Sequence, residues 1–193
     1  MTSHKTLLSS FVAALLALPL LACPPDRSAR APIAPAGPRA CHPHSIILVR
    51  HAEKVTTDPN DKDPDLSPAG QERAARLAQL LGKTAVTRLI ATEYKRTRNT
   101  LAPLAARLGK EVETRNASEA LDLIRELGNA ASESTIVVAT HSNVLPQIVA
   151  DLGAGRLKAL DPQGNLPDDE FGRVVIVSVG CGNAAVVAEL SSD

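Results

Sequence analysis

A run of four apolar residues, Ile-Ile-Leu-Val at positions 46–49, ends abruptly in Arg50 and His51. Its length and its β-branched residues are typical of a buried strand. The polar, turn-forming segment 56–65 follows closely. In an open α/β sheet, ligands bind at the carboxyl ends of the strands. A guanidinium beside an imidazole at such an end therefore indicates an anion site, although this run alone also fits a strand that merely ends in two polar residues.

Strand-like runs alternate with helical patterns along the rest of the chain. Ser67 is a good N-cap and Pro68 suits a first helical position, while glycines at 82, 109 and 128 suit helix ends. We expect helices over residues 68–81, 100–108, 117–127 and 144–152, with Ser118 as a possible cap of the third. We expect strands over residues 45–50, 86–91, 111–114, 134–140, 173–179 and 184–190. A hairpin turn at 180–183 and a long loop over 153–171 complete the predicted elements. The alternation predicts an α/β three-layer sandwich, in which a mostly parallel sheet with antiparallel strands at its end is flanked by helices.

Three predicted strand ends carry side chains of the same kind. Arg50 and His51 follow the first strand, Arg96 comes shortly after the second, and His141 follows the apolar strand 134–140. Because the carboxyl ends of parallel strands meet at one edge of a sheet, we expect these side chains to converge. Guanidinium groups bind phosphate oxygens in a bidentate manner. A neutral imidazole can attack phosphorus and a protonated one can stabilise the transition state, so the sequence predicts a phosphoryl site.

These motifs resemble those of the histidine phosphatases, also called the phosphoglycerate mutase-like superfamily. The family's Arg-His-Gly appears as Arg50-His51-Ala52. The family's Leu-Thr-x-x-Gly segment resembles residues 66–70. Its Ser-x-x-x-Arg-Ala-x-x-Thr segment resembles residues 92–100. Its strand end Val-x-His-Gly resembles residues 138–143. The variant Arg-His-Ala-Glu-Lys with a later His-Ser-Asn is similar to a small bacterial subgroup. The matches occur in the family's order between residues 46 and 152 and imply a phosphoglycerate mutase-like fold.

The resemblance also implies roles for individual residues. His51 would be the nucleophile that becomes phosphohistidine, Arg50 and Arg96 would hold the phosphoryl oxygens, and His141 would be the second histidine of the pocket. Ser142 and Asn143 precede the fourth predicted helix, so their backbone N–H groups could add to the anion site. The alternatives are a buried, hydrogen-bonded structural histidine at position 141 and a solvated charge at position 96.

The chain departs from the family pattern at two places and leaves one role unassigned. Ala52 stands where the family has glycine, so the backbone there must tolerate a side chain. Thr92 stands for the usual serine, which keeps a hydroxyl group. The motifs do not fix the general acid that protonates the leaving alcohol. Glu53 is the carboxylate nearest to His51 in the sequence and is the first candidate.

Three further carboxylates are weaker candidates for the acid, namely Glu93, Asp65 and Glu113. For each of the four, a plain surface carboxylate is the alternative, because a catalytic acid needs a pKa raised toward the operating pH.

The resemblance favours hydrolysis over phosphoryl transfer. Mutases of the superfamily carry a long insertion between the second arginine and the second histidine, whereas residues 96–141 contain only two helical segments and a short strand. Water should therefore reach the phosphohistidine. The chemistry requires no metal or other cofactor, and no acidic or Cys/His cluster has the spacing of metal ligands. We expect a metal-independent phosphatase of small phosphomonoesters; the alternative is a non-catalytic envelope lipoprotein that binds a phosphorylated ligand on the same fold.

Composition argues against two classes of partner. Lys+Arg and Asp+Glu balance at 21 each, so the chain has no excess charge for nucleic acid or a membrane surface. Aromatic residues make up 2% and Trp is absent, which leaves no platform on which bases could stack. Any anion site must therefore be local. The sequence gives no indication of the oligomeric state.

The N-terminal segment has the features of a targeting signal. His4 and Lys5 precede the apolar run 7–21, which is short for a bilayer span and ends in Ala22-Cys23. This pattern resembles a bacterial lipoprotein signal over residues 1–22, with lipid on Cys23, which would anchor the protein in the cell envelope. An uncleaved anchor helix and secretion after cleavage near Ala22 are the alternatives.

Residues 23–43 are rich in Pro, Ala and Arg and predict a tether that precedes a domain over residues 44–193. In an oxidising compartment, Cys41 and Cys181 would be the two thiols left for a disulfide. A bridge and two free thiols both fit the sequence.

Overall fold

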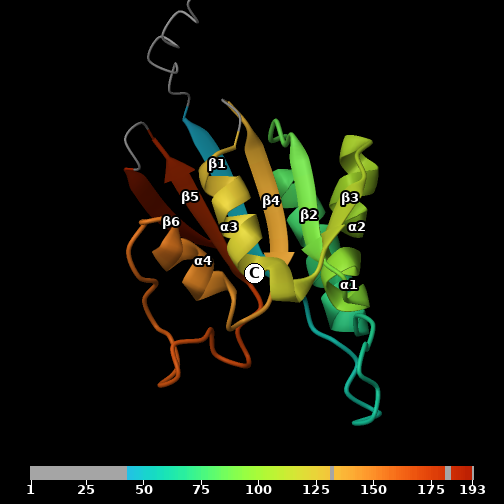
Figure 1. The fold of residues 1–193 in the computed structure, drawn as a ribbon. Coiled ribbons are helices and arrows are strands. Elements are labelled where there is room, and N and C mark those ends of the chain that lie inside the picture. The colour runs from blue at the N-terminus through green and yellow to red at the C-terminus, as the bar shows by residue number, and fades with distance from the viewer. Residues whose placement is uncertain (1–42, 131–132, 181–183, 193) are drawn as a thin grey trace, which may run out of the picture. The chain divides into compact units, whose positions relative to one another are not determined.

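The computed structural model describes residues 43–130, 133–180 and 184–192. These residues form one six-stranded sheet with helices on both faces (Figure 1). The elements in chain order are β1 (His44–Arg50), α1 (Pro68–Leu81), β2 (Arg88–Thr92), α2 (Lys95–Leu108), β3 (Val112–Arg115), the 3₁₀ turn η1 (Ala117–Glu119), α3 (Ala120–Gly128), β4 (Thr135–Thr140), α4 (Leu145–Asp151), β5 (Arg173–Val179) and β6 (Ala185–Ser191).

The strand order is β3-β2-β4-β1-β5-β6. Neighbouring strands from β3 to β1 run parallel, with Ile46 opposite Ile136 where β1 meets β4. β5 runs antiparallel to β1, and β6 antiparallel to β5. The predicted fold class, a mostly parallel sheet with antiparallel strands at its end, is confirmed. The carboxyl ends of β1, β2 and β4 therefore lie at one edge of the sheet, the lower edge in Figure 1.

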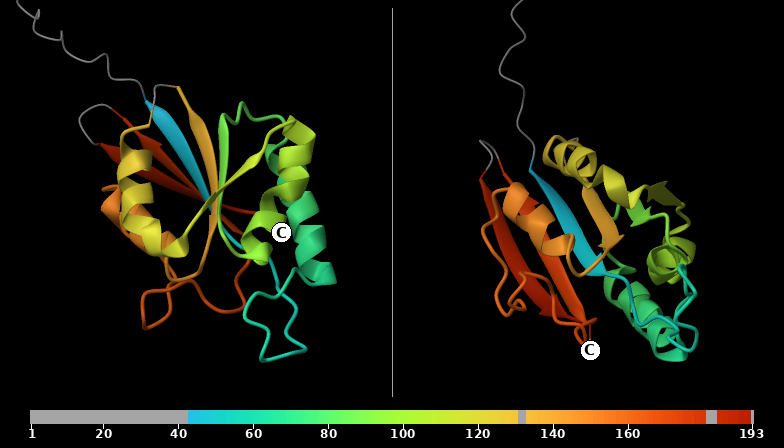
Figure 2. Two further views of the ribbon diagram at one scale, coloured as in Figure 1. Left: turned by 45° about the vertical axis from the view of Figure 1, so that its right-hand side comes forward. Right: turned by 60° about the horizontal axis from the view of Figure 1, so that its bottom comes forward.

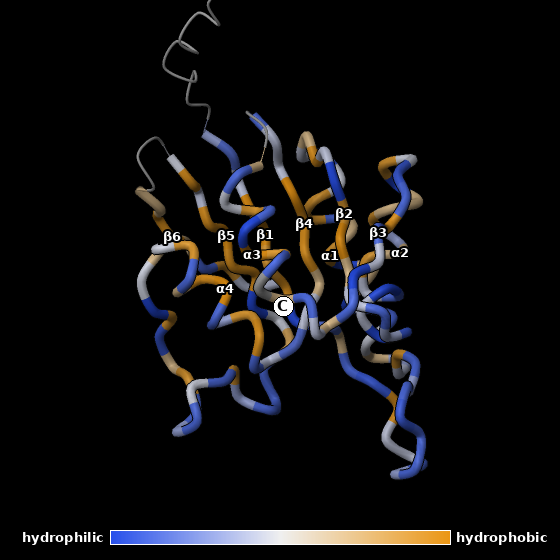
Figure 3. The backbone as a smooth tube through the Cα atoms, in the orientation of Figure 1, coloured by the Kyte–Doolittle hydropathy of each residue, from blue (hydrophilic) through white to orange (hydrophobic). Residues whose placement is uncertain are grey.

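The two faces of the sheet are covered by different helix pairs (Figure 2). Because side chains alternate along a strand, β1 sends Ile46 and Leu48 toward α3 and α4, and Ile47 and Val49 toward α1 and α2. Figure 3 shows hydrophobic residues along β4 and β5 and hydrophilic ones in the loop after β1. Both faces of β1 are thus buried, and a rigid strand carries Arg50 and His51.

Several local predictions are confirmed and three need correction. Ser67 caps α1 by accepting a hydrogen bond from the Gly70 N–H at 3.2 Å, and Gly109 ends α2 in the left-handed region at φ 62°. However, β2 begins two residues later than predicted, because a Val86 N–H bond to Thr84 O makes a tight turn there. The predicted second helix begins earlier, at position 95, and Ser118 is not a cap because it lies inside η1.

The chain after β1 is fastened to the start of α1. Ser67 N–H donates to Glu53 O at 2.9 Å, Val55 N–H donates to Asp65 O at 2.8 Å, and Lys54 forms an isolated β-bridge with residue 66. α1 approaches so closely that a Cβ atom on residue 70 would lie 2.1 Å from Glu53 O. The glycine at position 70 is therefore required for this contact.

The predictions about the N-terminal segment and the cysteines fall outside the described residues. Cys23, Cys41 and Cys181 all lie there, as do the signal and all of the tether except Pro43. Within the described ranges, no helix has both the length and the apolar character that a membrane crossing requires.

The Gly70 contact gives a stability prediction. Gly70→Ala should lower the free energy of unfolding by about 1–3 kcal/mol, because the overpacking against Glu53 O outweighs the better helix propensity of alanine. Urea unfolding measures the change. Gly128→Ala is the matched control, since its Cβ would meet Leu152 at an ordinary 3.7 Å. A Gly70→Ala protein as stable as the wild type would contradict the argument.

Candidate active site

His51 lies at the carboxyl end of β1 and is 7% exposed. Its backbone N–H donates to Thr140 O at 2.9 Å, which continues the pairing of β1 with β4 past the strand end. The ring Nδ1 lies 2.8 Å from Ala52 O. Because a carbonyl can only accept, Nδ1 carries the proton in this contact and the neutral ring keeps its lone pair on Nε2. This tautomer is the one that a nucleophilic Nε2 needs.

Ala52 explains how the chain accommodates a side chain where the resemblance leads one to expect glycine. Its methyl group is fully buried in a small apolar cluster with Leu66 and Ala74. Its N–H donates to Thr100 Oγ1 at 2.9 Å. The alanine therefore ties the loop after His51 to α1 and α2.

His141 follows β4 and faces His51, with the ring centroids 5.5 Å apart and the planes at 66°. Its Nε2 lies 3.1 Å from Thr92 Oγ1, and Thr92 in turn contacts Thr97 Oγ1 at 2.8 Å. The hydroxyl that Thr92 retains thus connects the second imidazole to the first turn of α2. His141 is therefore part of the site and not an isolated buried histidine.

Arg50 is held in place by the loop before β5. Its Nη1 donates to the carbonyl oxygens of Pro167, Asp168 and Glu170 at 2.8, 3.1 and 3.1 Å. Its guanidinium carbon lies 4.2 Å from the ring centroid of Phe171. Burial lowers the pKa of Arg50 from its ordinary value, and the charges of Asp168 and Glu170 oppose that shift. The Nε and Nη2 edge of the guanidinium makes none of these carbonyl bonds.

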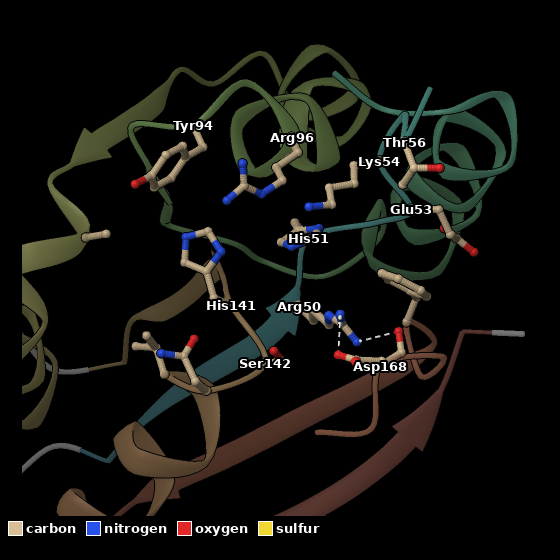
Figure 4. A pocket seen from close by; sticks show the side chains of 14 residues that line it. Arg50, His51, Glu53, Lys54, Thr56, Tyr94, Arg96, His141, Ser142 and Asp168 are labelled. Carbon is tan, nitrogen blue, oxygen red and sulfur yellow. Dashed lines mark hydrogen bonds and ion pairs between the residues drawn. The ribbon is translucent and has the colours of Figure 1, made fainter. Parts of the chain in front are cut away.

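Arg96 comes from the first turn of α2 and approaches the site from another element. Its guanidinium carbon lies 4.3 Å above the ring of Tyr94, and its Nη1 is 4.0 Å from Asp63 Oδ1. Figure 4 shows the Arg50 and Arg96 guanidinium groups in the same pocket as His51 and His141. The three strand ends therefore bring together the four side chains that the sequence singled out.

The two arginines share an unusual feature. Each has a buried Nε with no hydrogen-bond partner among the described residues. Leaving a buried donor unsatisfied costs about 1–3 kcal/mol, and native structures contain few such groups. Two of them on cations beside the same imidazole point to an anionic ligand that accepts from both.

The aromatic residues in the site were not predicted. The chain has one Tyr and two Phe, and Tyr94 and Phe171 each pack against one of the arginines. A cation over an aromatic face is favourable, so these rings help to orient the guanidinium groups. Their scarcity in the sequence was the available signal, but it does not reveal which side chains they contact.

The structure disfavours Glu53 as the general acid, although the side chain lines the cavity. Arg73 Nε donates to both carboxylate oxygens at 3.0 Å, and Arg73 Nη2 donates to Oε1 at 2.8 Å. Burial raises the pKa of Glu53, but the hydrogen bonds from Arg73, a backbone hydrogen bond and the charges of Arg73 and Arg76 together lower it below its ordinary value. An ionised carboxylate held by an arginine is the opposite of what a proton donor needs.

The other candidate carboxylates differ in their contacts. Asp65 accepts bonds from Asn99 and from a backbone N–H, and Glu113 is paired with Arg88. Glu93 has no ion pair within the described ranges. Its Oε2 accepts a bond from the Ala117 N–H at 2.7 Å, and its charge acts on His141. Glu93 therefore replaces Glu53 as the candidate acid because no arginine holds it, although its side chain does not line the cavity.

The site opens into a cavity of about 820 Å³. All four predicted residues line it, as do Ser142 and Asn143. Asn143 is thus positioned to contact a ligand. In the part of the chain that the structure describes, no three His, Cys, Asp or Glu side chains are grouped as metal ligands.

Both imidazoles are neutral at pH 7 in the unliganded site. Burial lowers the pKa of His51 to about 4, with smaller contributions from Arg96, His141 and Arg50. Burial also lowers the pKa of His141 to about 4, and Arg96 adds to that shift. A phosphoryl dianion between them would raise both pKa values, because an opposite charge favours the protonated form. The second imidazole can therefore become charged when an anion binds.

Residues 46–118 match the model of the histidine phosphatase superfamily (branch 1). This range contains Arg50, His51 and Arg96, while His141 lies beyond it. No curated protein matches the chain in sequence.

Several solved structures are similar in fold. A candidate phosphohistidine phosphatase, SixA, from Nakamurella multipartitia is 22% identical with a TM-score of 0.52, over 74% of this chain and 87% of that one. The protein histidine phosphatase SixA complexed with tungstate is 15% identical with a TM-score of 0.58, over 77% and 97%. A mycobacterial glucosyl-3-phosphoglycerate phosphatase is 15% identical with a TM-score of 0.51, over 78% and 98%. The chain thus has the phosphoglycerate mutase-like fold.

The lowered histidine pKa values can be tested by titration. The NMR signals of His51 and His141 should have midpoints near pH 4, and inorganic phosphate should move both upward. Because the folded pKa lies below the ordinary 6.5, the unfolded chain binds more protons between about pH 6.5 and 4. The free energy of unfolding should therefore fall as pH falls through that window. Midpoints near 6.5 that phosphate does not move would contradict the described burial.

Proposed function

We propose that the chain is a phosphomonoesterase of the histidine phosphatase superfamily, whose branch 1 model residues 46–118 match, and that it acts through a phosphohistidine formed on His51. The observation that carries this proposal is the pair of buried, unpartnered Nε atoms on Arg50 and Arg96 beside that imidazole. A tetrahedral phosphoryl group has oxygens for both guanidinium groups. A carboxylate ligand would have only two oxygens to share among four surrounding side chains.

In the first step, His51 Nε2 attacks phosphorus, the N–P bond forms and the bond from phosphorus to the ester oxygen breaks. The hydrogen bond from Nδ1 to Ala52 O stabilises the positive charge that develops on the ring. Arg50 and Arg96 hold the equatorial oxygens, and the phosphoryl dianion favours the protonated form of His141. The departing oxygen receives a proton, for which Glu93 is the candidate donor.

In the second step, water attacks phosphorus and the N–P bond breaks. The proton of the water passes to the carboxylate that protonated the leaving oxygen, so that inorganic phosphate is released and His51 returns to its neutral form. Between Arg96 and His141 the chain contains only the rest of α2, β3, η1, α3 and β4 among its described elements. The cavity of about 820 Å³ gives water access to the ring. These features support hydrolysis over transfer of the phosphoryl group to a second substrate.

Trapping of the intermediate tests the role of His51. After mixing with p-nitrophenyl phosphate and quenching in alkaline denaturant, the wild type should carry phosphate on residue 51, as determined by mass spectrometry of peptides. His51→Asn should carry none and should lose at least a thousand-fold in kcat, since the nucleophile is absent. A folded wild type that binds phosphate but never turns over an ester would instead be the non-catalytic binding module.

We also propose that the protein is exported and lipid-anchored, on the basis of the signal-like residues 1–22 and Cys23. Mass spectrometry of the mature N-terminus should find a diacylglycerol-modified Cys23 as the first residue. An unmodified Cys23, or an intact residue 1, would contradict the anchor. A disulfide between Cys41 and Cys181 stays a prediction for the same compartment, and a free-thiol count on the folded protein tests it.

A further inference from the structure

Lys54 is a third cation in the cavity that the proposed chemistry does not use. Its side chain lines the cavity. Figure 4 shows its ammonium group directed into the pocket, toward the part where Arg96 and His51 lie, and away from Asp168. The residue is exposed, whereas Arg50 is buried. Lys54 therefore reaches in from the mouth of the cavity, while Arg50 holds its floor.

The backbone that carries Lys54 is fixed. The bridge to residue 66 and the flanking bonds of Glu53 and Val55 hold residues 53–55 against the start of α1, in the contact that Gly70 permits. Glu53 turns toward Arg73, while the next side chain turns into the cavity. The backbone at residue 54 is thus held in place by hydrogen bonds, and the lysine side chain leaves it on the cavity side.

The ammonium group of Lys54 has no carboxylate partner among the residues that the structure describes. No ion pair or hydrogen bond of this side chain occurs within the described residues. Its sequence neighbour Glu53 is occupied by Arg73. Asp168, another carboxylate at the cavity, lies 4.0 Å from Arg50 Nη2 instead. A compact, uncompensated positive charge at the mouth of a ligand cavity favours an anionic ligand group.

The anionic group that Lys54 would bind is distinct from the reacting phosphoryl group. A phosphomonoester dianion carries two negative charges, and Arg50 and Arg96 provide two positive charges with unpartnered buried donors. Lys54 adds a positive charge outside this set, and because it is exposed while Arg50 is buried, it can meet a different part of the substrate. Its exposed position fits a group several bonds away from phosphorus.

Building on the proposed phosphatase function, we propose that Lys54 determines specificity by binding a second anionic group of the substrate. The preferred substrates are then phosphomonoesters that also carry a carboxylate or a second phosphate. The lysine raises their affinity and does not take part in the bond-breaking step.

Two matched pairs of esters test this with the full chain at fixed ionic strength. O-phosphoserine and O-phosphoethanolamine differ only in a carboxylate, and fructose 1,6-bisphosphate and fructose 6-phosphate differ only in a second phosphate. For at least one pair, Lys54→Met should lose roughly ten-fold in kcat/KM on the more anionic member, mainly through KM, and less than two-fold on the other. The pair that responds identifies the anionic group. Lys54→Arg, which keeps the charge, should retain most of the preference.

Lys95→Met is the matched control, because Lys95 is exposed near the site at the start of α2 but does not line the cavity. Equal losses on both members of each pair, no loss on any ester, or the same loss in Lys95→Met would overturn the role of Lys54. If the wild type hydrolyses no ester at all, the proposed function fails instead. Calorimetric binding of the same four esters to wild type and Lys54→Met then gives the same comparison, and equal affinities would overturn the lysine proposal.

Discussion

Two arginine side chains whose buried Nε atoms find no partner in the described part of the chain are the constraint around which this site is built. Burying a guanidinium donor without an acceptor is unfavourable, and here it happens twice beside the same imidazole. The fold supports both groups from outside: three carbonyl oxygens and Phe171 hold Arg50, and Tyr94 lies against Arg96. The arrangement is unfavourable on its own and becomes favourable when an oxyanion accepts from both arginines. A structure with this property is prepared for a phosphoryl group.

The sheet makes this arrangement possible. His51 and His141 come from neighbouring parallel strands, β1 and β4, and Arg96 follows β2 on the other side of β4. Residues 90 positions apart in the chain therefore meet without a long loop. The antiparallel strand β5 completes the site, because the segment that enters it supplies Phe171 and the carbonyl oxygens that bind Arg50. Packing of both sheet faces keeps these strand ends fixed.

The sequence was sufficient for the fold class, for most element positions and for the meeting of four predicted side chains at one cavity, while the roles of these side chains stay predictions. Those predictions rest on strong local signals: apolar runs of strand length, the Ser67 cap, the glycine at 109, and polar residues directly after strands. The start of β2 was misplaced because Val86, although buried, belongs to a turn, and burial alone does not distinguish a turn from a strand. Glu53 is disfavoured as the acid because Arg73 holds its carboxylate, and no periodicity indicates a pairing between residues 20 positions apart.

Contacts between distant segments account for the rest of what sequence reasoning missed. The long loop before β5 was predicted as a loop, but its binding to Arg50 spans 117 positions and depends on main-chain carbonyls, which carry no residue-specific signal. Tyr94 is next to a predicted site residue, yet its stacking depends on the turn that begins α2. Lys54 belongs to the Arg-His-Ala-Glu-Lys motif, but the motif does not indicate the bridge to residue 66 or the position of the lysine at the cavity.

The central claim is that Arg50, Arg96, His51 and His141 surround one phosphoryl group. The most direct test is a crystal structure of the protein with tungstate, a tetrahedral oxyanion of similar charge. The account predicts one tungstate with oxygens within about 3.2 Å of the Nε or Nη2 atoms of both arginines and with His51 Nε2 facing the metal centre. A tungstate bound elsewhere, or one that leaves both arginine Nε atoms without an acceptor, would contradict it.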